Sequence, residues 1–533
     1  STPGVNLSNA SAGAGRNDRS FQQITLRGMV PSSTNSTLTS TFIDGVPVAS
    51  ATAIASVADP ARVEILKGPQ AAYFGRNTFA GAINVVNKMP GDEIGGSMAL
   101  MGGTRGNIDF NGALDGPLVN DKFGFRVGAR FFQRDGSYKN AANRGETLGD
   151  QQTKTFTLLL TAQPTDNFSA KLFTLYSEDE DGASAQGYLS AFEVRANNGV
   201  ANVPFNSGSN AGTVIIPSYS NCNVLGYAAG IVATEARVSR PSICGAVPKL
   251  NLAFSPAQNT LSDALLAASV ADPRQRVVSP SDGAQQHGLV REYIHSHLNL
   301  DYNFGESGYT LSSLTGINAE YWSEIADLDN YDSRLLINPA NPTGAIANRR
   351  NFWDFVFGVE RETYDFSQEL RLTYDKKGPF TGVFGISYLK TNVWNNLINI
   401  SSEVLLTGTP GVTRENLTSA SKTPVETTGI FFGGTYAFTD ALKVSLEGRY
   451  QTDEITGLAS SAPMGVTVSA AGSAQFGVPA GFYGPLAEII SKKYNNFLPR
   501  VIAQYDFQPD LMGYASYSEG VNVGTNSINT AFL

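Results

Sequence analysis

The sequence is poor in the residues that build metal centres and disulfide scaffolds. Its 533 residues include two cysteines, three histidines and three tryptophans. Two cysteines exclude a cysteine-rich metal scaffold or a disulfide-dense mini-protein, and three histidines leave little room for a histidine metal site. The sequence also lacks any apolar run of roughly 18 residues, which excludes a transmembrane helix. This does not exclude a transmembrane β-barrel, because each strand of a barrel needs only about 10 alternating residues.

Charged residues are scarce as well, at 16% of the chain, against about 25% in ordinary soluble domains. The 38 basic and 47 acidic residues give a net charge of -9, which argues against a nucleic-acid binder with a basic face. Hydrophobic residues make up 41% and aromatic residues 10%, so the chain is not intrinsically disordered. We therefore expect a folded protein that binds no nucleic acid.

Beyond residue 95 the chain alternates between apolar and polar residues. Residues 442–450, for example, place Leu442, Val444 and Leu446 on one face and Lys443 and Ser445 on the other. A period of two with one apolar face is the pattern of a β-strand. About 13 segments show it, near residues 96–104, 107–115, 122–134, 153–163, 167–177, 291–304, 307–323, 361–375, 379–395, 425–438, 441–453, 493–507 and 510–520.

The connections between these segments alternate in length. Short turns fall at residues 163–167, 304–308, 375–379, 438–441 and 507–510, and long loops at 135–152, 178–290, 323–360, 396–424 and 454–492. Outer-membrane barrels sort their connections in this way, with short periplasmic turns and long external loops. Aromatic residues near the segment ends predict the girdles of such a barrel: Tyr138, Tyr176, Tyr302, Tyr321, Trp322, Tyr374, Trp394, Tyr450 and Tyr494. A soluble all-β domain with buried alternating faces is the alternative.

Residues 1–94 have a different texture, with short apolar runs separated by Gly, Pro, Asn and Asp. Residues 62–90 read RVEILKGPQAAYFGRNTFAGAINVVNKMP. Gly68, Pro69 and Gly75 force tight turns, and Gly81 lets strands approach closely in a confined space. A glycine-rich phosphate loop is disfavoured, because no Walker lysine–serine pair and no GxGxxG follows a strand here.

This stretch resembles the plug core of TonB-dependent outer-membrane receptors, whose pattern is close to RVEVLRGPQ-x-x-LYGR-N-x-x-GG-x-INIVTK-x-P. Pro3-Gly-Val5, Leu26-Arg-Gly28 and Phe42-Ile-Asp-Gly-Val46 match the family's PGV, IRG and Y-x-DGV elements. Residues 366–371 and 511–519 look like barrel strands of the family. The resemblance assigns a set of residues to the plug motif: Arg62, Glu64, Gly68, Pro69, Gly75, Arg76, Gly81 and Asn84.

The resemblance implies an all-β fold, a transmembrane antiparallel β-barrel with an N-terminal α/β plug inside its lumen. We expect residues 1–94 to form the plug, without its TonB box and first strand, and residues 95–533 to form the barrel. The family's barrels have 22 strands, as plugged transporter barrels do. About 13 of them are expected in this chain, so its C-terminal strands would be missing and the barrel as given would not close.

The family also implies a lock between plug and wall. Arg27 and Lys67 fall on the two basic plug positions of that lock, which pair with two lumen-facing glutamates. Glu369 and Glu447 have the matching strand parity and are the predicted partners. Lys67 stands where the family usually has Arg, and so lacks the bidentate guanidinium fork. Alternatively, the glutamates pair with neighbours such as Arg371 and Arg449.

Cysteine and histidine supply two further predictions. Cys222 and Cys244 both lie in the long loop 178–290, which would face an oxidising compartment, so we expect a disulfide between them. Two separately buried thiols are the alternative. His295 and His297 lie two apart on one strand face, a spacing that can bind a metal. With no third ligand visible, a pair of wall side chains is favoured, and we expect neither a metal site nor a cofactor.

No Ser/His/Asp set or HExxH motif suggests catalysis, so an enzyme is not expected. The resemblance implies an energised receptor in the cell outer membrane of a Gram-negative bacterium, surrounded by lipid and lipopolysaccharide. A small-molecule ligand would bind from outside, and periplasmic TonB, with its ExbB/ExbD system, would pull on the plug. Ferric siderophores are the commonest ligands of the family. Uptake of an oligosaccharide or aromatic compound is the alternative, with loop 178–290 as the main determinant. A passive porin is disfavoured, because porins have no N-terminal plug.

Overall fold

The structure is a computed structural model. It describes residues 3–9, 19, 22–29, 38–48, 56–57, 59–75, 78–140, 145–184, 193–194, 203–205, 212–215, 275–276, 288–327, 356–400, 418–460 and 486–521. These residues form one sheet of 13 strands, one of four, two of three and one of two. No helix within these ranges is long and apolar enough to cross a membrane.

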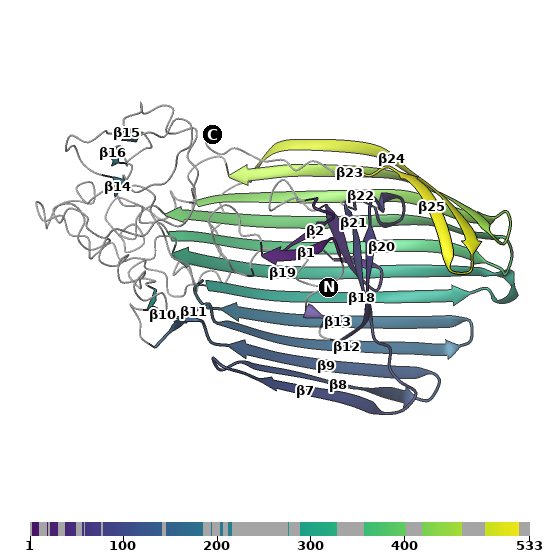
Figure 1. The fold of residues 1–533 in the computed structure, drawn as a ribbon, viewed down its shortest axis with the longest axis horizontal. Coiled ribbons are helices and arrows are strands. Elements are labelled where there is room, and N and C mark those ends of the chain that lie inside the picture. The colour runs from purple at the N-terminus through teal and green to yellow at the C-terminus, as the bar shows by residue number, and fades with distance from the viewer. Residues whose placement is uncertain are drawn as a thin grey trace, which may run out of the picture.

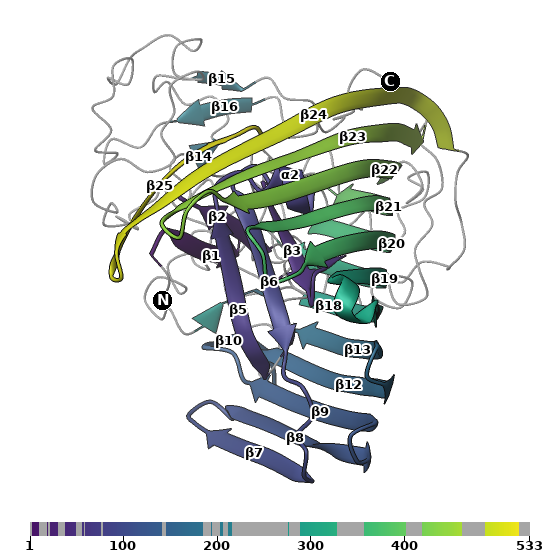
Figure 2. The same cartoon turned by 90° about the vertical axis from the view of Figure 1, so that its right-hand side faces the viewer.

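The 13-stranded sheet is antiparallel throughout and follows chain order, so each strand pairs with the next along the chain. Figures 1 and 2 show it curving into a trough. Each predicted alternating segment overlaps one of its strands, with ends that differ by a few residues, which confirms the strand prediction. The strands are β7 (Gly95–Gly102), β8 (Ile108–Val119), β9 (Phe123–Arg134), β12 (Gln151–Thr165), β13 (Phe168–Asp181), β18 (Gly288–Asn303), β19 (Tyr309–Asp327), β20 (Val356–Asp375), β21 (Phe380–Ile400), β22 (Thr418–Ala437), β23 (Leu442–Ser460), β24 (Leu486–Gln508) and β25 (Leu511–Ser518).

The trough has two free edges. Among the described strands, β7 pairs only with β8, and β25 pairs only with β24. Short turns join the strands at one end of the trough, for example Asp166–Asn167 and the 3-10 turn η3 (Gly305–Ser307). The connections that leave the other end are longer in sequence, as between β13 and β18 or β19 and β20, and this matches the predicted sorting of loop lengths. The sheet is therefore an open part of a barrel, with two distinct rims.

The two faces of this sheet are inverted relative to a soluble protein. On β23 the apolar Leu446 and Tyr450 are 57% and 52% exposed, whereas Arg449 and Asp453 on the other face are 4% and 0% exposed. On β20, likewise, Tyr364 is exposed and Asp365 is buried. An apolar outer face and a polar interior are typical of a transmembrane barrel and exclude the alternative of a soluble sandwich.

Aromatic side chains line the short-turn rim. They lie in contacting pairs, including Tyr302 with Phe304, whose ring centroids are 5.0 Å apart, and Tyr436 with Phe438 at 4.9 Å. These rings are exposed, as expected of an interface girdle. Trp322 is an exception. The prediction placed it in the girdle, but it is only 2% exposed and packs inside with Leu289 and Val359, because its parity on β19 points it into the lumen.

The N-terminal elements lie on the concave side of the trough (Figure 2). β1 (Val5–Asn9) and β2 (Gln22–Leu26) form the two-stranded sheet. β3 (Thr39–Ile43), β4 (Val46–Val48), β5 (Pro60–Lys67) and β6 (Gly81–Asn87) form the four-stranded one, in the order β4-β3-β6-β5. The helical turn α2 (Ala71–Phe74) lies between β5 and β6. β3 and β6 are parallel, and the other pairs are antiparallel. We call this unit the plug.

Two apolar clusters hold the plug in place. Ile24, Leu26, Ala80 and Ile83 form a core within it. A second cluster joins plug and wall: Ile43, Val48, Val57, Val85, Leu159, Phe173, Leu175 and Tyr293.

Six short strands form the two three-stranded sheets. One sheet holds β10 (Tyr138–Asn140), β11 (Thr147–Leu148) and β17 (Gln275–Arg276), and the other holds β14 (Glu193–Val194), β15 (Val203–Phe205) and β16 (Gly212–Ile215).

Candidate functional site

The plug core is built around glycines that the backbone requires. Gly68 and Gly75 have φ of 89° and 79°, in the left-handed region that favours glycine. At Gly81 a Cβ would lie 2.1 Å from the carbonyl oxygen of Leu66 and 2.6 Å from a methyl group of Leu26. The glycines of the motif therefore fix the turn between β5 and α2, the end of α2, and the close contact of β6 with β5.

The polar residues of the motif tie the plug strands to each other. The Nδ2 of Asn84 donates to Glu64 at 2.9 Å, and the Oδ1 of Asn84 accepts from the backbone N–H of Gly45 at 3.0 Å. Arg62 forms an ion pair with Glu64 at 2.7 Å. The hydrogen bonds from Asn84 and Arg62 hold the pKa of the Glu64 carboxyl below its usual value. Of the predicted motif residues, Arg76 lies outside the described part of the chain.

The turn carrying α2 is the part of the motif that meets the wall. The guanidinium of Arg371 lies 5.1 Å from the ring centroid of Tyr73, and the ring of Phe431 packs edge-on against Tyr73 at 5.9 Å. Arg500 donates a hydrogen bond to Gln70 at 3.1 Å. A Cβ on Gly75 would lie 3.0 Å from the guanidinium of Arg449. Three wall arginines thus surround an uncharged turn of the plug.

In this structure Glu369, Glu447 and Lys67 contact residues other than the predicted lock partners. Glu369 pairs with Arg371, its neighbour on the same strand face, and Glu447 lies 3.3 Å from Arg500. The ammonium of Lys67 donates to the backbone carbonyl of Pro3 at 2.7 Å. Among the described residues no ion pair joins Arg27 or Lys67 to either glutamate. The pairing of plug cations with Glu369 and Glu447 stays a prediction.

Three of the five plug–wall ion contacts of the described residues run with the opposite polarity, from plug acids to wall bases, with His297 counted as a base. Asp44 lies at the β3–β4 hairpin turn, where Asp44 and Gly45 have φ of 51° and 80°, as a type I′ turn requires. Its carboxylate lies 3.0 Å from the ammonium of Lys171 and 3.2 Å from Nε2 of His297. The carboxylate also accepts from the side chain of Asn87 at 2.6 Å.

The environment of Asp44 stabilises its charged form. Burial alone would raise the pKa of this carboxyl, but the contact with His297, the charge of Lys171 and the backbone N–H of Asn87 hold that pKa well below its usual value. The Asp44 side chain is only 1% exposed. An ionised carboxylate in such a place is stable only with its partners, so Asp44 anchors the hairpin to β13 and β18.

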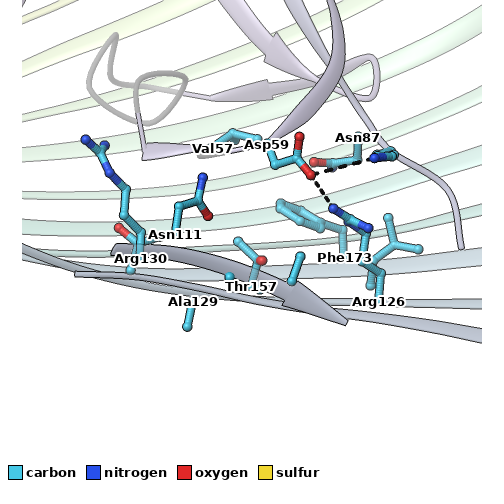
Figure 3. Close-up of a pocket in the computed structure, with 15 residues that line it drawn as sticks. Val57, Asp59, Asn87, Asn111, Arg126, Ala129, Arg130, Thr157 and Phe173 are labelled. Atoms are coloured by element: carbon cyan, nitrogen blue, oxygen red, sulfur yellow. Dashed lines mark hydrogen bonds and ion pairs between the residues drawn. The ribbon is translucent and has the colours of Figure 1, made fainter. Parts of the chain in front are cut away.

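A second plug acid, Asp59, pairs with Arg126 of β9, which also pairs with Asp115 of β8. Figure 3 shows Asp59 and Arg126 directed toward each other at the edge of a pocket between plug and wall. Asn111, Arg130 and Thr157 also line this pocket. Asp59 therefore ties the plug to the part of the wall nearest the β7 edge.

Arg19 makes the remaining plug–wall ion pairs of the described residues. Its Nε donates to Asp181 of β13 at 2.8 Å, and its Nη1 lies 3.4 Å from Asp179. Arg291 of β18 pairs with Asp179 at 3.1 Å and donates to the backbone carbonyl of Arg19. This contact has the polarity that the family lock predicts, with a plug cation on wall carboxylates, but it uses different residues.

The sequence reasoning missed Asp44, Asp59 and Arg19 as wall contacts. Asp44 stood in the quoted stretch Phe42–Val46, and His295 and His297 were singled out, but no sequence signal links positions so far apart. Within the described residues, no group of three His, Cys, Asp or Glu side chains has the arrangement of a metal site. Cys222 and Cys244 lie outside the described residues, so their predicted disulfide stays a prediction.

A curved antiparallel sheet with an apolar outer face, a polar interior and a glycine-turned plug on its concave side defines a plugged outer-membrane barrel. Family models agree with this class. The TonB-dependent receptor plug domain matches residues 1–82, and the TonB-dependent receptor-like β-barrel matches residues 248–532. The chain belongs to the TonB-dependent receptor family.

Similar proteins include receptors for ferric siderophores. The ferric enterobactin receptor PirA of Pseudomonas aeruginosa is 29% identical over 235 residues, which cover 38% of this chain and 29% of PirA. The pesticin receptor of Yersinia enterocolitica is 28% identical over 169 residues, covering 31% of this chain and 24% of the receptor. The aligned parts therefore span less than a third of these relatives.

Solved structures share the fold. The ferric yersiniabactin uptake receptor FyuA of Yersinia pestis superposes with a TM-score of 0.61 at 16% identity, covering 99% of this chain and 62% of FyuA. The ferripyoverdine receptor of Pseudomonas aeruginosa bound to ferripyoverdine gives a TM-score of 0.55 at 15% identity, covering 97% of this chain and 53% of that receptor. The chain thus spans about three fifths of FyuA and about half of the second receptor.

Proposed function

We propose that this chain is part of a receptor for active uptake of a ferric siderophore across the cell outer membrane of a Gram-negative bacterium. The observation that carries the proposal is the seating of the plug core against the inner wall, through α2 and through Asp44. The relatives named as ferric enterobactin receptors favour an iron chelate as the ligand.

In this proposal residues 1–94 are the plug and residues 95–533 belong to the barrel. The free edges of β7 and β25 pair with further strands, which bring the barrel toward 22 and close it. The exposed apolar face contacts outer-membrane lipid and lipopolysaccharide. Neither plug nor wall performs covalent chemistry. TonB, energised by ExbB and ExbD, pulls on the plug from the periplasm, and the plug–wall contacts decide how far it moves.

The test is uptake of radiolabelled iron by cells that carry the complete receptor as their only siderophore receptor. We expect accumulation of a ferric siderophore that stops when the proton-motive force is collapsed or TonB is removed. Uptake that persists without the proton-motive force would assign the protein to passive porins. Energised uptake of an oligosaccharide or aromatic compound, with no uptake of any ferric siderophore, would overturn the proposed ligand and keep the receptor class.

A further inference from the structure

A chain of buried polar groups runs from the barrel wall into the plug at Asp44. The hydroxyl of Tyr293 donates to Oδ1 of Asn318 at 2.9 Å, and Nδ1 of His295 lies 2.7 Å from the same oxygen. Nε2 of His295 lies 2.8 Å from Nδ1 of His297. Nε2 of His297 lies 3.2 Å from Oδ2 of Asp44 in an ion-pair contact that is not aligned as a hydrogen bond, and this nitrogen has no hydrogen-bond partner among the described residues.

Both ends of this chain are hydrogen-bond acceptors. Asn318 is oriented by its Nδ2, which donates to the backbone carbonyl of Pro47 in the plug at 3.2 Å, so its Oδ1 must face His295. At the other end, the backbone N–H and side-chain amide of Asn87 donate to Asp44, and the ammonium of Lys171 forms an ion pair with it. Asp44 therefore accepts hydrogen bonds from Asn87, pairs with the Lys171 cation and is the ionised acceptor at this end of the polar chain.

Counting hydrogens shows what these two ends require. The contacts of Asn318 with His295 and of His295 with His297 are hydrogen bonds, and each contains one hydrogen. At the third contact a bare Nε2 of His297 would direct its lone pair at the Asp44 carboxylate 3.2 Å away, so this contact needs a hydrogen as well. Two neutral imidazoles carry only one N–H each, and a neutral pair would leave two acceptors facing each other at one contact. Such a contact inside a dry protein costs more than an ordinary hydrogen bond contributes. A third proton on the histidine pair removes it.

The charges around the pair bear on where this proton resides. His295 and His297 are 0% and 1% exposed, and burial among Phe173 and its neighbours opposes a charge on them. The Asp44 carboxylate favours the charge, and Lys171 of β13, the other cation beside it, opposes it. At the other end of this series of polar groups, Glu320 of β19 and Asp365 of β20 interact electrostatically with Tyr293. Glu320 also forms an ion pair with Arg291.

We propose that the His295–His297 pair binds one proton beyond those of two neutral imidazoles when the plug hairpin is seated, and that this proton resides on His297 beside Asp44. Seating of the plug and binding of the proton are then coupled. When the hairpin leaves the wall the anion is gone, the pair returns to two neutral rings, and one proton is released. The hairpin is thereby held more tightly at lower pH within the range where the pair titrates.

The first test counts hydrogens and needs no ligand and no transport. These 533 residues contain three histidines, so ¹⁵N-histidine labelling of a receptor with His287→Gln, and with any histidine beyond these residues also replaced, leaves only the two rings of the pair. We expect the receptor in detergent near pH 6.5 to show three protonated ring nitrogens and one bare nitrogen. Two bare nitrogens would overturn the proposal. This outcome is independent of the proposed siderophore uptake, which can fail while the proton count stands.

The second test uses Asp44→Asn, whose amide can donate the third hydrogen to His297 while removing the anion. Hydrogen exchange of the β3–β4 hairpin reports its opening, relative to the intrinsic exchange rate at each pH. Raising the pH should increase opening in the wild type by up to about tenfold per pH unit while the proton is being lost, and Asp44→Asn should show no such dependence. A wild type and an Asp44→Asn variant with equal pH dependence would contradict the coupling.

Asp59→Asn is the matched control. Asp59 is also a plug acid on a wall base, but its partner Arg126 is an arginine, a residue type that does not lose its proton in proteins. The variant should loosen the plug and leave the pH dependence of the hairpin intact. Loss of that dependence in Asp59→Asn would assign it to general plug loosening and overturn the specific role of the histidine pair.

Discussion

Arg500 on the barrel wall joins Gln70 of the plug to Glu447 of the wall. Its Nη1 donates to Oε1 of Gln70 at 3.1 Å and lies 3.3 Å from Oε2 of Glu447. Glu447 is therefore linked to the plug through Arg500, and its charge is balanced by this arginine without a plug lysine. This arrangement gives a sharp way to test the predicted lock.

Double-mutant cycles decide which cation Glu447 and Glu369 use. If Lys67 pairs with either glutamate, the cycle of Lys67→Ala with Glu447→Ala or Glu369→Ala should show a coupling of roughly 0.5–3 kcal/mol in the free energy of plug unfolding. Arg500→Ala with Glu447→Ala is the reference cycle and should show coupling of that size. Additive effects in both Lys67 cycles would refute the predicted lock, and the same pair of cycles with Arg27→Ala tests its other cation.

Gly81→Ala should destabilise the plug by about 1–3 kcal/mol or more, because Gly81 has φ of 152° and an added methyl group would collide with the Leu66 carbonyl. The denaturant midpoint of plug unfolding measures the change. Gly102→Ala on β7 is the control, since nothing lies within 4 Å of a Cβ there. Equal midpoints for the two variants would show that the close contact of β5 and β6 is not required.

The stabilising effect of Asp44 should disappear only in acid. A carboxyl whose pKa is lowered on folding stabilises the folded state above its unfolded pKa of about 3.9, and the effect is lost as pH falls toward the lower folded value. Between pH 7 and pH 5 the carboxylate itself stays ionised, and below about pH 4 the plug should weaken in the wild type more steeply than in Asp44→Asn. Unfolding midpoints across this range measure it, with Asp92→Asn at an exposed position as the control. Parallel curves for wild type and Asp44→Asn below pH 4 would contradict the prediction.

Removal of residues 1–94 should open the lumen of the complete receptor. The apolar cluster and ion pairs that join plug and wall disappear with them, and small solutes should then pass. Single-channel conductance in planar bilayers measures this, with the intact receptor as the reference. Unchanged conductance after the deletion would mean that these residues do not occlude the barrel.

Cys222 and Cys244 should be joined in a disulfide. The bridge would close a loop of about 20 residues and restrict the unfolded loop by roughly 3 kcal/mol in the chain-entropy model. Thiol titration of the denatured, unreduced protein should find no free thiol, and two thiols after reduction. Two free thiols before reduction would refute the bridge.

The strands were predictable because their signal is local. Successive side chains of a strand point to opposite faces, so the apolar Leu446 and the charged Arg449 indicate from the sequence alone which face meets lipid and which faces the lumen. Composition was not enough for Trp322. It neighbours Tyr321 on β19, and only parity decides which of two adjacent aromatics faces inward.

The plug–wall partners could not be predicted, because they depend on how the plug is oriented inside the lumen. Glu369 and Arg371 lie two apart on one strand face, so their pairing follows from the alternation of the strand. This pairing is the alternative to the lock that the sequence analysis gave. Asp44 and His297 are far apart in the chain and meet only through the seating of the β3–β4 hairpin. The family resemblance gave the motif, but the wall partners of the plug come from the register of this structure.

The contact of Lys67 with the Pro3 carbonyl has a mechanical consequence. Pro3 precedes β1, and the next carbonyl, that of Gly4, accepts from the backbone N–H of Arg27 at 2.8 Å. Tension that enters the plug along its first residues reaches these two bonds before it reaches the β1–β2 ladder or the wall contacts of Asp44 and Asp59. If the pull peels β1 away from β2, the bonds rupture one after another, and the peak force is set by the strongest single step and not by the sum of all contacts.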